Sequence, residues 1–394
     1  MQDVYITAAV RTPMGSFGGA LAPLSAPQLG AIAIRGALER AKVPADLVNE
    51  VYFGHVLTAG VGQAPARQAA LGADIPKHVP CTTVNKVCAS GMKATTIGAQ
   101  TIMLGLNDIV VTGGMESMSN APYLVPRARW GYTYGHGELW DAIVRDGLED
   151  AYQHSVMGVF ADATARKYNI SRAEQDEFAI LSYKRSAQAT SSGMFKEEII
   201  PVEVPQRKGD PIVVSEDEEY KRVKFEKIPK LRPVFTPDGT VTAANASTLN
   251  DGAAALVLAS KAAIEKHGLT PLARIVAFAD AAQEPEWFTT APVKAAELAI
   301  QRAGLRKEDI ALYEVNEAFA VVTLAFAKLA DVPIDKINIF GGACSLGHPL
   351  GASGARIIAT LLSALRQNGH RYGLATLCNG GGGASAIIIE NLQA

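Results

Sequence analysis

The chain repeats one arrangement of strands and helices twice, about 265 residues apart. The sequence CASG at residues 88–91 opens an apolar stretch that ends at Gly105, and GASG at residues 351–354 opens a second that ends at Gly369. A β-type segment precedes each stretch (CTTVNKV and KINIFGGA), and an apolar strand follows each (DIVVTGGM and YGLATLCNGG). Two flanking strands correspond as well, VYITAAV with ARIVAFADA and EVYFGHVL with ALYEVNEAF. The pattern indicates one duplicated α/β unit and excludes a solenoid of short repeats.

Alternating strands and helices predict largely parallel sheets that helices cover on both faces. Both ASG helices are apolar nearly all round, so we expect them at the centre of the molecule. Residues 119–248 differ in character, and we predict that they form an insertion between the last strands of the first half. They contain the aromatic stretch ARWGYTYGHGELW and a helix that begins with a capping box, Ser171 with Glu174, and ends at Gly193. Insertions of this kind usually build or cover a binding site.

Composition and charge exclude several classes of protein. A chain with 48% hydrophobic and 19% charged residues is typical of an ordinary soluble protein. The net charge of −2 gives no electrostatic basis for binding nucleic acid or an anionic membrane. No stretch approaches the roughly 18 apolar residues of a spanning helix. The N-terminus, MQDVYITAAVRTP, resembles no signal peptide or presequence, so we expect a cytoplasmic protein or a mature chain whose leader has been removed.

Cys88 stands in NKVCASGM, between a predicted strand and the start of a buried helix. The four cysteines of the chain show neither C-x-x-C nor a histidine at zinc-ligand spacing, so we expect free thiols. A single cysteine is more often a packed core residue than a nucleophile. The small polar neighbours of Cys88 favour a nucleophile at a sharp turn, where the helix N-terminus lowers the pKa of the thiol.

His348 lies in CSLGHPLGASG, at the place in the second repeat that corresponds to Cys88 in the first, offset by a few residues. If the halves pack about a pseudo-twofold axis, both residues reach the same seam, and a Cys–His pair meets the requirement for an activated thiol. Asn316, in YEVNEAFAV, follows an earlier strand of the second half. Taken singly it is more typical of a helix cap, and a donor to a water or carbonyl is the alternative.

Cys378 precedes an asparagine and four glycines in TLCNGGGGASA, residues 376–386. Glycine loses more conformational freedom on folding than any other residue, so the run indicates that backbone groups must be accessible here without obstruction by side chains. Such amides can approach a developing oxyanion, and a cysteine with a pKa near neutrality can take and return protons. A phosphate-binding loop is the weaker alternative, because GxGxxG and GxxxxGK[ST] are both absent. A basic cluster forms either a solvated face or a contact for a phosphorylated ligand: Lys221, Arg222, Lys224 and Lys227.

Taken together, these motifs resemble the thiolase family from the first strand to the last. The resemblance rests on VNKVCASGMKA, GGMESMSNAPY, NASTLNDGAAA, NEAF, GHPLGASGARI and CNGGGG. It is strongest with the acetyl-CoA acetyltransferases, including the potassium-activated mitochondrial and the cytosolic types. The resemblance implies a duplicated thiolase fold, with two βαβαβαββ halves packed as a five-layered αβαβα core and an inserted loop domain. It divides the chain into an N-terminal half (1–118 with 249–268), a loop domain (119–248) and a C-terminal half (269–394).

The resemblance also implies an acyltransferase that condenses two acetyl-CoA into acetoacetyl-CoA and CoA. Cys88 would carry the acetyl group, and His348 would deprotonate it. Asn316 would position a water in the oxyanion hole for the second acetyl-CoA, from which Cys378 would take the α-proton. The backbone N–H groups of Cys88 and Gly380 would form the other oxyanion hole.

Ligand and partner expectations come from the same resemblance. CoA is expected as substrate and product, with no covalent cofactor. The expected assembly is a homotetramer, and the aromatic stretch from Trp130 to Trp140 is a candidate contact between its subunits. The implied CoA contacts are Met157, Tyr183, Arg222, Val223, Lys224, Lys227 and Ser247. The implied potassium ligands are Tyr183 and the carbonyls of Ala243, Ala244, Ala246 and Cys344. Two other functions stay open, a degradative 3-ketoacyl-CoA thiolase that favours longer chains and a non-catalytic acyl-CoA or lipid carrier.

Overall fold

A computed structural model describes residues 2–394. Its centre is one ten-stranded sheet with the strand order β12-β13-β14-β11-β1-β10-β5-β3-β4, and the short β2 pairs with β10. The strands of the N-terminal half are β1 (Val4–Arg11), β2 (Gly15–Ser16), β3 (Glu50–Gly54), β4 (Cys81–Val84), β5 (Ile109–Ser117) and β10 (Asn250–Ser260). Those of the C-terminal half are β11 (Ala273–Ala282), β12 (Leu312–Val315), β13 (Tyr372–Asn379) and β14 (Gly383–Asn391).

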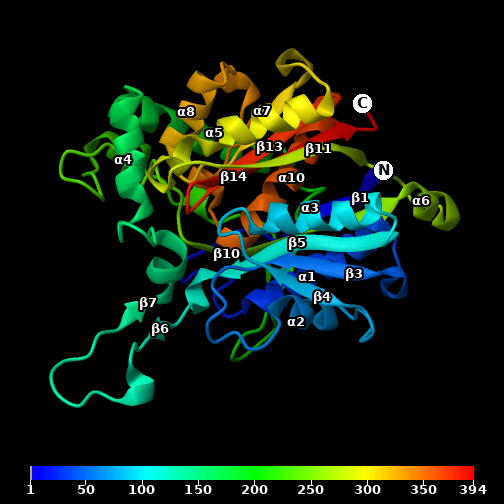
Figure 1. Cartoon of the computed structure of the whole chain (residues 1–394), viewed down its shortest axis with the longest axis horizontal. Helices are drawn as coiled ribbons and strands as arrows, with labels where there is room; N and C mark the ends of the chain where they lie inside the picture. Colours follow the sequence, from blue (N-terminus) through cyan, green and yellow to red (C-terminus); the bar gives the residue numbers. More distant parts are fainter. Residues whose placement is uncertain (1) are drawn as a thin grey trace.

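Helices form three layers around the two halves of this sheet, as Figure 1 shows. On the outer face of the first half lie α1 (Ala26–Ala41) and α2 (Pro65–Gly72), and on that of the second half lie α7 (Ala291–Ala303) and α8 (Ala320–Leu329). The central layer consists of α3 (Ser90–Met103) and α10 (Leu350–Gln367), which contact each other and strands of both halves. The helix that follows β10 is α6 (Lys261–His267). The predicted five-layered fold class is confirmed.

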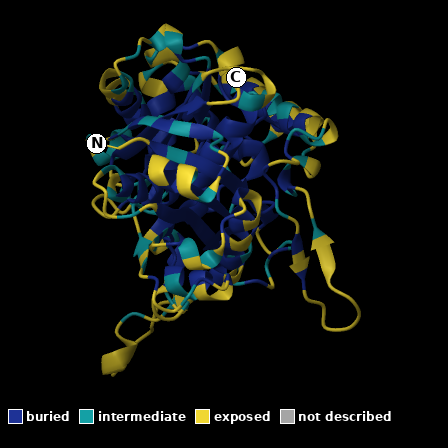
Figure 2. Cartoon of the chain, turned by 90° about the vertical axis from the view of Figure 1, so that its right-hand side faces the viewer, coloured by how far each residue is buried: buried dark blue, intermediate teal, exposed yellow. Residues whose placement is uncertain are grey.

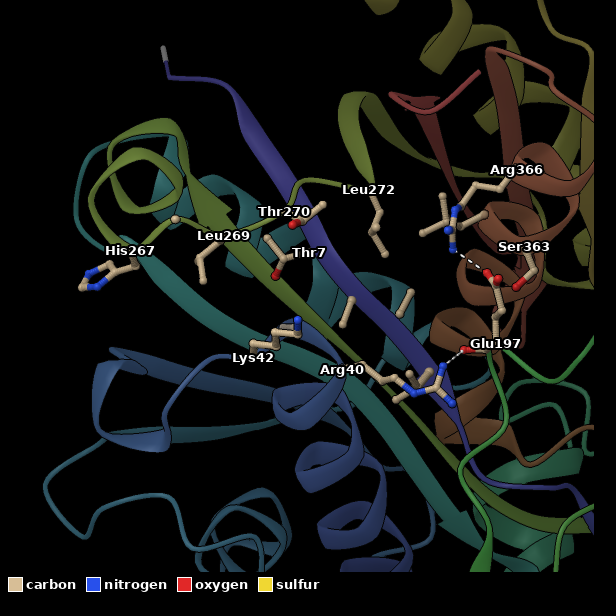
Figure 3. Close-up of a pocket in the computed structure, with 16 residues that line it drawn as sticks. Thr7, Arg40, Lys42, Glu197, His267, Leu269, Thr270, Leu272, Ser363 and Arg366 are labelled. Carbon is tan, nitrogen blue, oxygen red and sulfur yellow. Dashed lines mark hydrogen bonds and ion pairs between the residues drawn. The ribbon is translucent and has the colours of Figure 1, made fainter.

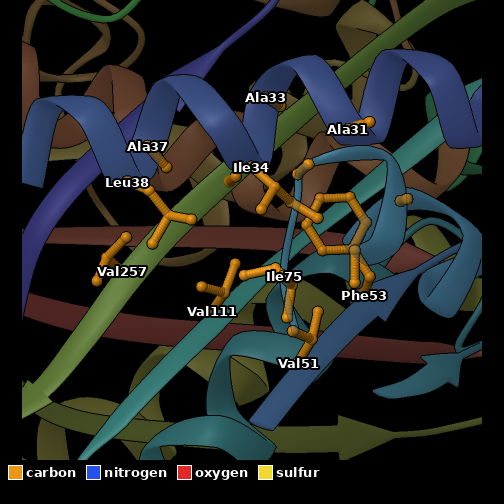
Figure 4. Packing of buried hydrophobic residues seen from close by; sticks show 14 of the residues in the cluster. Ala31, Ala33, Ile34, Ala37, Leu38, Val51, Phe53, Ile75, Val111 and Val257 are labelled. Atoms are coloured by element: carbon orange, nitrogen blue, oxygen red, sulfur yellow. The ribbon is translucent and has the colours of Figure 1, made fainter. Parts of the chain in front are cut away.

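The outer layer of the first half shows how the sequence produces this packing. Helix α1 begins at a capping box in which Ser25 and Gln28 satisfy each other's backbone N–H groups, and its C-cap Lys42 has a left-handed φ of 54°. Its buried side points Ile34 and Leu38 at the sheet, where they meet apolar residues of β3, β5 and β10 (Figure 4). This amphipathic pattern is what places α1 on the sheet.

The sheet is mixed, so the expectation of largely parallel strands is wrong. Parallel pairing holds for β3 with β4, β3 with β5, and β12 with β13, which helical crossovers connect. The remaining pairs are antiparallel, because β14 returns from β13 through a tight glycine turn and β10 returns from β5 after the insertion. Within the sheet, the strands of the two halves join through three antiparallel residue pairs between β1 and β11.

The second half lacks one predicted strand. The segment KINIFGGA pairs with β12 only through the isolated bridge between Tyr313 and Ile337. Asn338, at a left-handed φ of 49°, explains the difference. Its side-chain amide accepts from the N–H of Val315 and donates to the carbonyl of Val315, both at 2.8 Å, so a side chain replaces the backbone ladder.

The insertion leaves the core after β5 and returns at β10. Its main helices are α4 (Met157–Lys167) and α5 (Arg172–Ser191), and the capping box predicted at Ser171 and Glu174 is present. Two short strand pairs belong to it, β6 (Tyr123–Leu124) with β7 (Trp140–Asp141) and β8 (Val202–Val204) with β9 (Ile212–Val214). The β6–β7 pair carries an arm that projects from the body and is exposed along most of its length (Figures 1 and 2). Among residues 2–394, no helix combines the length and the apolar character that a membrane span requires.

Candidate active site

Cys88 occupies a strained turn between β4 and α3. The residue before it, Val87, has a left-handed φ of 48°, which a β-branched side chain rarely adopts. Two side chains hold this turn. Asn85 accepts from the N–H of Val87 at 2.9 Å, while Ser90 accepts from the N–H of Lys86 at 2.8 Å and donates to the carbonyl of Val87 at 2.6 Å. The predicted nucleophile therefore sits on a turn whose geometry its neighbours enforce.

The electrostatics of Cys88 differ from the sequence-based prediction. Burial raises the pKa of this thiol to about 12, although the N–H groups of Gly380 and of Cys88 itself act to lower it. The prediction of a lowered pKa is wrong because desolvation outweighs the helix N-terminus. A thiol of this kind needs a base in the site to become nucleophilic.

His348 is held in one tautomer by the first turn of α10. Its Nδ1 lies 2.6 Å from the hydroxyl of Ser353, and that hydroxyl donates its only hydrogen to the carbonyl of Pro349 at 2.9 Å. The hydroxyl must therefore accept from Nδ1–H, which leaves the lone pair on Nε2. Burial, together with the charge of Arg356, lowers the pKa of His348 to about 3, so the ring is neutral and available as a base.

Asn316 lies against the imidazole with its amide in a defined orientation. Its Nδ2 is 3.5 Å from both ring nitrogens of His348. Its Oδ1 accepts from the guanidinium of Arg356 at 3.4 Å. Because a guanidinium only donates, the oxygen of Asn316 faces Arg356 and the N–H donors face the histidine. The buried Arg356 thus orients the side chain of Asn316 so that its N–H donors face the site.

Cys378 is the second thiol that the fold brings to this seam. It lies near the end of β13, is fully buried and packs against an apolar cluster with Met157 and Phe288. Burial, and then the neighbouring Cys88, raise its pKa well above the ordinary value, so the prediction of a pKa near neutrality is wrong. The N–H of Gly380 also reaches the sulfur of Cys88, so the two cysteine segments meet.

The glycine run serves the turn more than the oxyanion. Gly381 and Gly382 have φ values of 81° and 83°, and a Cβ at Gly382 would clash with the backbone of Gln283. A Cβ at Gly380 would meet only Met157 and Val87, at 3.5 and 3.7 Å. Glycine at 381 and 382 therefore permits the turn that brings the N–H of Gly380 to Cys88.

A buried carboxylate ties the two halves together beside the site. Glu116, at the end of β5, accepts from the N–H groups of Val56 and Leu57, both at 3.1 Å, and from that of Gly351 at 3.0 Å. The Nε2 atom of His55 lies 3.1 Å from the same carboxylate. Gly351 belongs to the first turn of α10, so Glu116 fixes the helix that follows His348.

The predicted CoA contacts lie on the insertion and near the active-site seam. Arg222 is exposed and 3.8 Å from Glu219, Ser247 donates to the carbonyl of Ala318 at 2.9 Å, and Met157 is buried near Gly380. The remaining residues of this set are Tyr183, which is buried, Val223, which is half-buried, and Lys224 and Lys227, which are exposed.

The donors predicted for potassium fit a hard cation. Among residues 2–394, the carbonyl oxygens of Ala243, Ala244 and Ala246 accept no hydrogen bond. Cys344 is buried, and burial followed by the proximity of Cys344 raises the pKa of Tyr183. Carbonyl oxygens without donors can replace the water shell of potassium, so this set of residues is chemically suitable.

Sequence reasoning missed four residues that position the predicted ones: Ser90, Glu116, Ser353 and Arg356. The two serines occupy equivalent places in CASG and GASG, and both accept from one neighbour and donate to a backbone carbonyl. Their repetition in the duplicated motif was a usable signal. Glu116 and Arg356 gave none, because only the folded chain shows that they are buried beside the site.

Comparison with known proteins identifies the family. The profile of the thiolase N-terminal domain matches residues 4–262, and that of the thiolase C-terminal domain matches residues 269–391. The chain belongs to the thiolase family. This thiolase is 54% identical to the acetyl-CoA acetyltransferase of Schizosaccharomyces pombe, with 99% of each chain covered. It is 56% identical to the human mitochondrial acetyl-CoA acetyltransferase, with coverage of 100% of this chain and 91% of the human protein.

A solved structure agrees with the fold of this thiolase. The crystal structure of Acat5 thiolase from Ascaris suum in complex with coenzyme A superposes with a TM-score of 0.95 at 47% identity, covering 99% of this chain and 100% of the other. The expectation of a cytoplasmic protein is contradicted, because the human, macaque and rat relatives are all named mitochondrial. The fission yeast relative carries no such label.

Removing the Ser353 hydroxyl is expected to impair catalysis without unfolding this thiolase. In Ser353→Ala, Nδ1–H loses its acceptor and the imidazole can adopt the other tautomer, so kcat should fall roughly tenfold while KM stays nearly constant. Ser363→Ala, a buried serine further along α10, is the matched control. The pH profile of kcat/KM should show no break near pH 6.5 in the wild type, because the pKa of His348 is about 3. A rise in KM alone in Ser353→Ala would contradict this role.

Proposed function

We propose that this thiolase catalyses the reversible Claisen condensation of two acetyl-CoA into acetoacetyl-CoA and CoA, through an acetyl group carried by Cys88. Relatives named acetyl-CoA acetyltransferase, 54% and 56% identical over nearly the whole chain, support the reaction. The structural observation that supports it best is the presence of a second buried thiol, Cys378, beside the first. A condensation without decarboxylation needs a base that removes a proton from the α-carbon of the substrate.

The first half-reaction uses Cys88 and His348. The thiol gives its proton to Nε2 of His348, and the sulfur attacks the carbonyl carbon of acetyl-CoA. The developing oxyanion lies between the N–H groups of Cys88 and Gly380. Collapse breaks the bond to the CoA sulfur, which takes the proton from His348 and leaves as the free thiol.

The second half-reaction uses Cys378 as the base. The Cys378 thiol first gives its proton to the neutral His348. The resulting thiolate takes a proton from the methyl group of a second acetyl-CoA, while Asn316 and the protonated His348 stabilise the enolate oxygen. The carbanion attacks the acetyl carbon on Cys88, forms the new carbon–carbon bond and expels the Cys88 sulfur, which takes its proton back from His348. Because the pKa of Cys378 is raised, the thiol holds its proton firmly between turnovers and can return it in the reverse direction.

The insertion would bind the CoA part of both substrates. Arg222, Lys224 and Lys227 present positive charge for the phosphates, and Met157 and Ser247 lie closer to the seam. Potassium, when bound, supplies a fixed positive charge at the insertion. Tyr183, the carbonyls of Ala243, Ala244 and Ala246, and that of Cys344 would hold it.

Intact-protein mass spectrometry tests whether Cys88 carries the acetyl group while Cys378 acts as the base. The Cys378→Ala variant is expected to gain one acetyl group on Cys88 from acetyl-CoA, while condensation falls by at least about a hundredfold. Near-normal condensation by this variant would refute the role of Cys378 as the base. The absence of an acetyl adduct on both wild type and variant would favour the non-catalytic carrier.

Chain-length preference separates the proposed reaction from the degradative alternative. Thiolysis rates are compared for acetoacetyl-CoA and for a ten-carbon 3-ketoacyl-CoA, with and without potassium. The apolar side chains of Met157 and Phe288 enclose Cys378, which favours a short acyl group. A strong preference for the ten-carbon substrate would contradict the short-chain proposal, and an unchanged rate without potassium would contradict the ion's role.

A homotetramer is proposed as the assembly, on the evidence of the β6–β7 arm. Trp130 is 87% exposed and Tyr134 fully exposed, which is costly for large aromatic rings on a lone subunit. Replacing both with serine is expected to convert tetramers to dimers in sedimentation velocity. Tyr152→Ser, which alters an exposed tyrosine outside the arm, is the control. A wild-type protein that sediments as a dimer would refute this proposal.

A further inference from the structure

A cavity remote from the thiols lies where β1 separates from β11. Its volume is about 500 Å³, within the range of small-molecule sites. It is bounded by the C-terminal end of α1, by β1, by the connection from α6 to β11 and by the C-terminal part of α10 (Figure 3). None of the residues assigned above to the active site, CoA or potassium lines it.

The charges around this cavity are unbalanced. Arg40, Lys42 and Arg366 line it, and Glu197 is the single carboxylate. Arg366 pairs with Glu197 at 2.6 Å, and Arg40 donates to backbone carbonyls, including that of Glu197 at 2.8 Å. Within residues 2–394, Lys42 has neither an ion pair nor a side-chain hydrogen bond, and Figure 3 shows it near Arg40. With His267 neutral, the lining carries a net charge of +2.

An unpaired stretch of β1 adds one backbone donor to these cations. β1 pairs with β11 only over Val4–Ile6, and its next contact on that side is the bridge from Arg11 to Ile199. The N–H of Arg11 points to this side, where it donates to the carbonyl of Glu198 at 2.7 Å. Because strand residues alternate, the amide of Ala9 faces the same side and the cavity that it lines. The hydroxyls of Thr270 and Ser363 also lie on the lining.

We propose that this cavity is a binding site for a small dianion, a metabolite with two phosphate or carboxylate groups. Two uncompensated positive charges match two negative ones, and the backbone amide of Ala9 with the hydroxyls of Thr270 and Ser363 provides further donors for oxyanions. The cavity is too small for a folded partner or a nucleic acid. Lys42 is the principal anchor, because its charge is free and its main chain is fixed by the cap of α1.

Titration calorimetry tests the site with two probes, inorganic pyrophosphate and succinate, which separate the phosphate from the carboxylate source. Lys42→Asn removes the charge and suits the left-handed backbone at this position, so it should fold. We expect its affinity for the preferred probe to fall about tenfold, as for a lost charged hydrogen bond. Lys42→Arg should restore most of the affinity.

Lys227→Asn is the matched control, because it removes a lysine from the proposed CoA surface. It should leave probe binding at the cavity unchanged while weakening the interaction with CoA. Loss of probe binding in Lys227→Asn but not in Lys42→Asn would overturn the proposal, since the probe would then occupy the CoA surface. Failure of the wild type to bind either probe would overturn it as well. Neither result bears on the chemistry of Cys88 and Cys378.

Discussion

Replacing Cys88 with alanine is expected to abolish condensation and thiolysis together, with kcat lowered by at least about a thousandfold. Both half-reactions pass through the sulfur, so no partial route through Cys378 can compensate. The strained turn should survive, because Asn85 and Ser90 hold it through backbone atoms that do not involve the thiol. The loss should therefore be chemical, with unchanged thermal stability and retained binding of CoA.

Initial rates in both directions check this expectation, and Cys81→Ser is the matched control. Cys81 is half-buried on the edge strand β4, and its sulfur contacts the carbonyl of Val79 at 3.4 Å, a contact that a hydroxyl can retain. The control should keep near wild-type rates. Residual activity of Cys88→Ala above one per cent of the wild type would mean that another group carries the acetyl intermediate.

The duplication made the fold predictable because two similar α/β units can bury their apolar helices only against each other. The burial of α10 from Leu350 through Leu365 is the direct result of a sequence that is apolar nearly all round. The same reasoning predicts that Cys88 and His348 lie at one seam between the halves. The direction of each strand in the sheet was harder to predict, because the order of elements does not reveal whether β10 runs parallel or antiparallel to β5 after the insertion.

The predicted pKa values were wrong for groups whose pKa is determined mainly by burial. A helix N-terminus near Cys88 suggested a low pKa, yet the pKa is about 12, because the surrounding protein displaces most of the water that would stabilise the thiolate of this half-buried cysteine. The neutral state of His348 likewise results first from burial and then from the charge of Arg356, a residue of the helix that follows it. The strand lost at Asn338 shows the same limit, since one amide side chain replaced a ladder that the pattern alone predicted.

The glycine at 114 is expected to be the most sensitive structural position in the chain. A Cβ there would overlap the carbonyl oxygen of Gly351 in α10, which is backbone and cannot rotate away. Gly54 and Gly91 face the same oxygen, at 2.8 and 2.9 Å from the position of an added Cβ. Three glycines from β3, α3 and β5 therefore form the socket that seats the first turn of α10. Gly114→Ala must push that helix, and with it His348, away from Cys88.

Denaturant unfolding should show a loss of at least about 3 kcal/mol in Gly114→Ala, because backbone overlap forces two layers apart. Activity should fall more steeply than stability under folding conditions, since the histidine moves from its partner thiol. Gly380→Ala is the matched control for stability: an added Cβ there meets only ordinary contacts, so unfolding should change by less than about 1 kcal/mol. If Gly114→Ala unfolded like the wild type, the close approach of α10 to β5 would not be what holds the two halves in register.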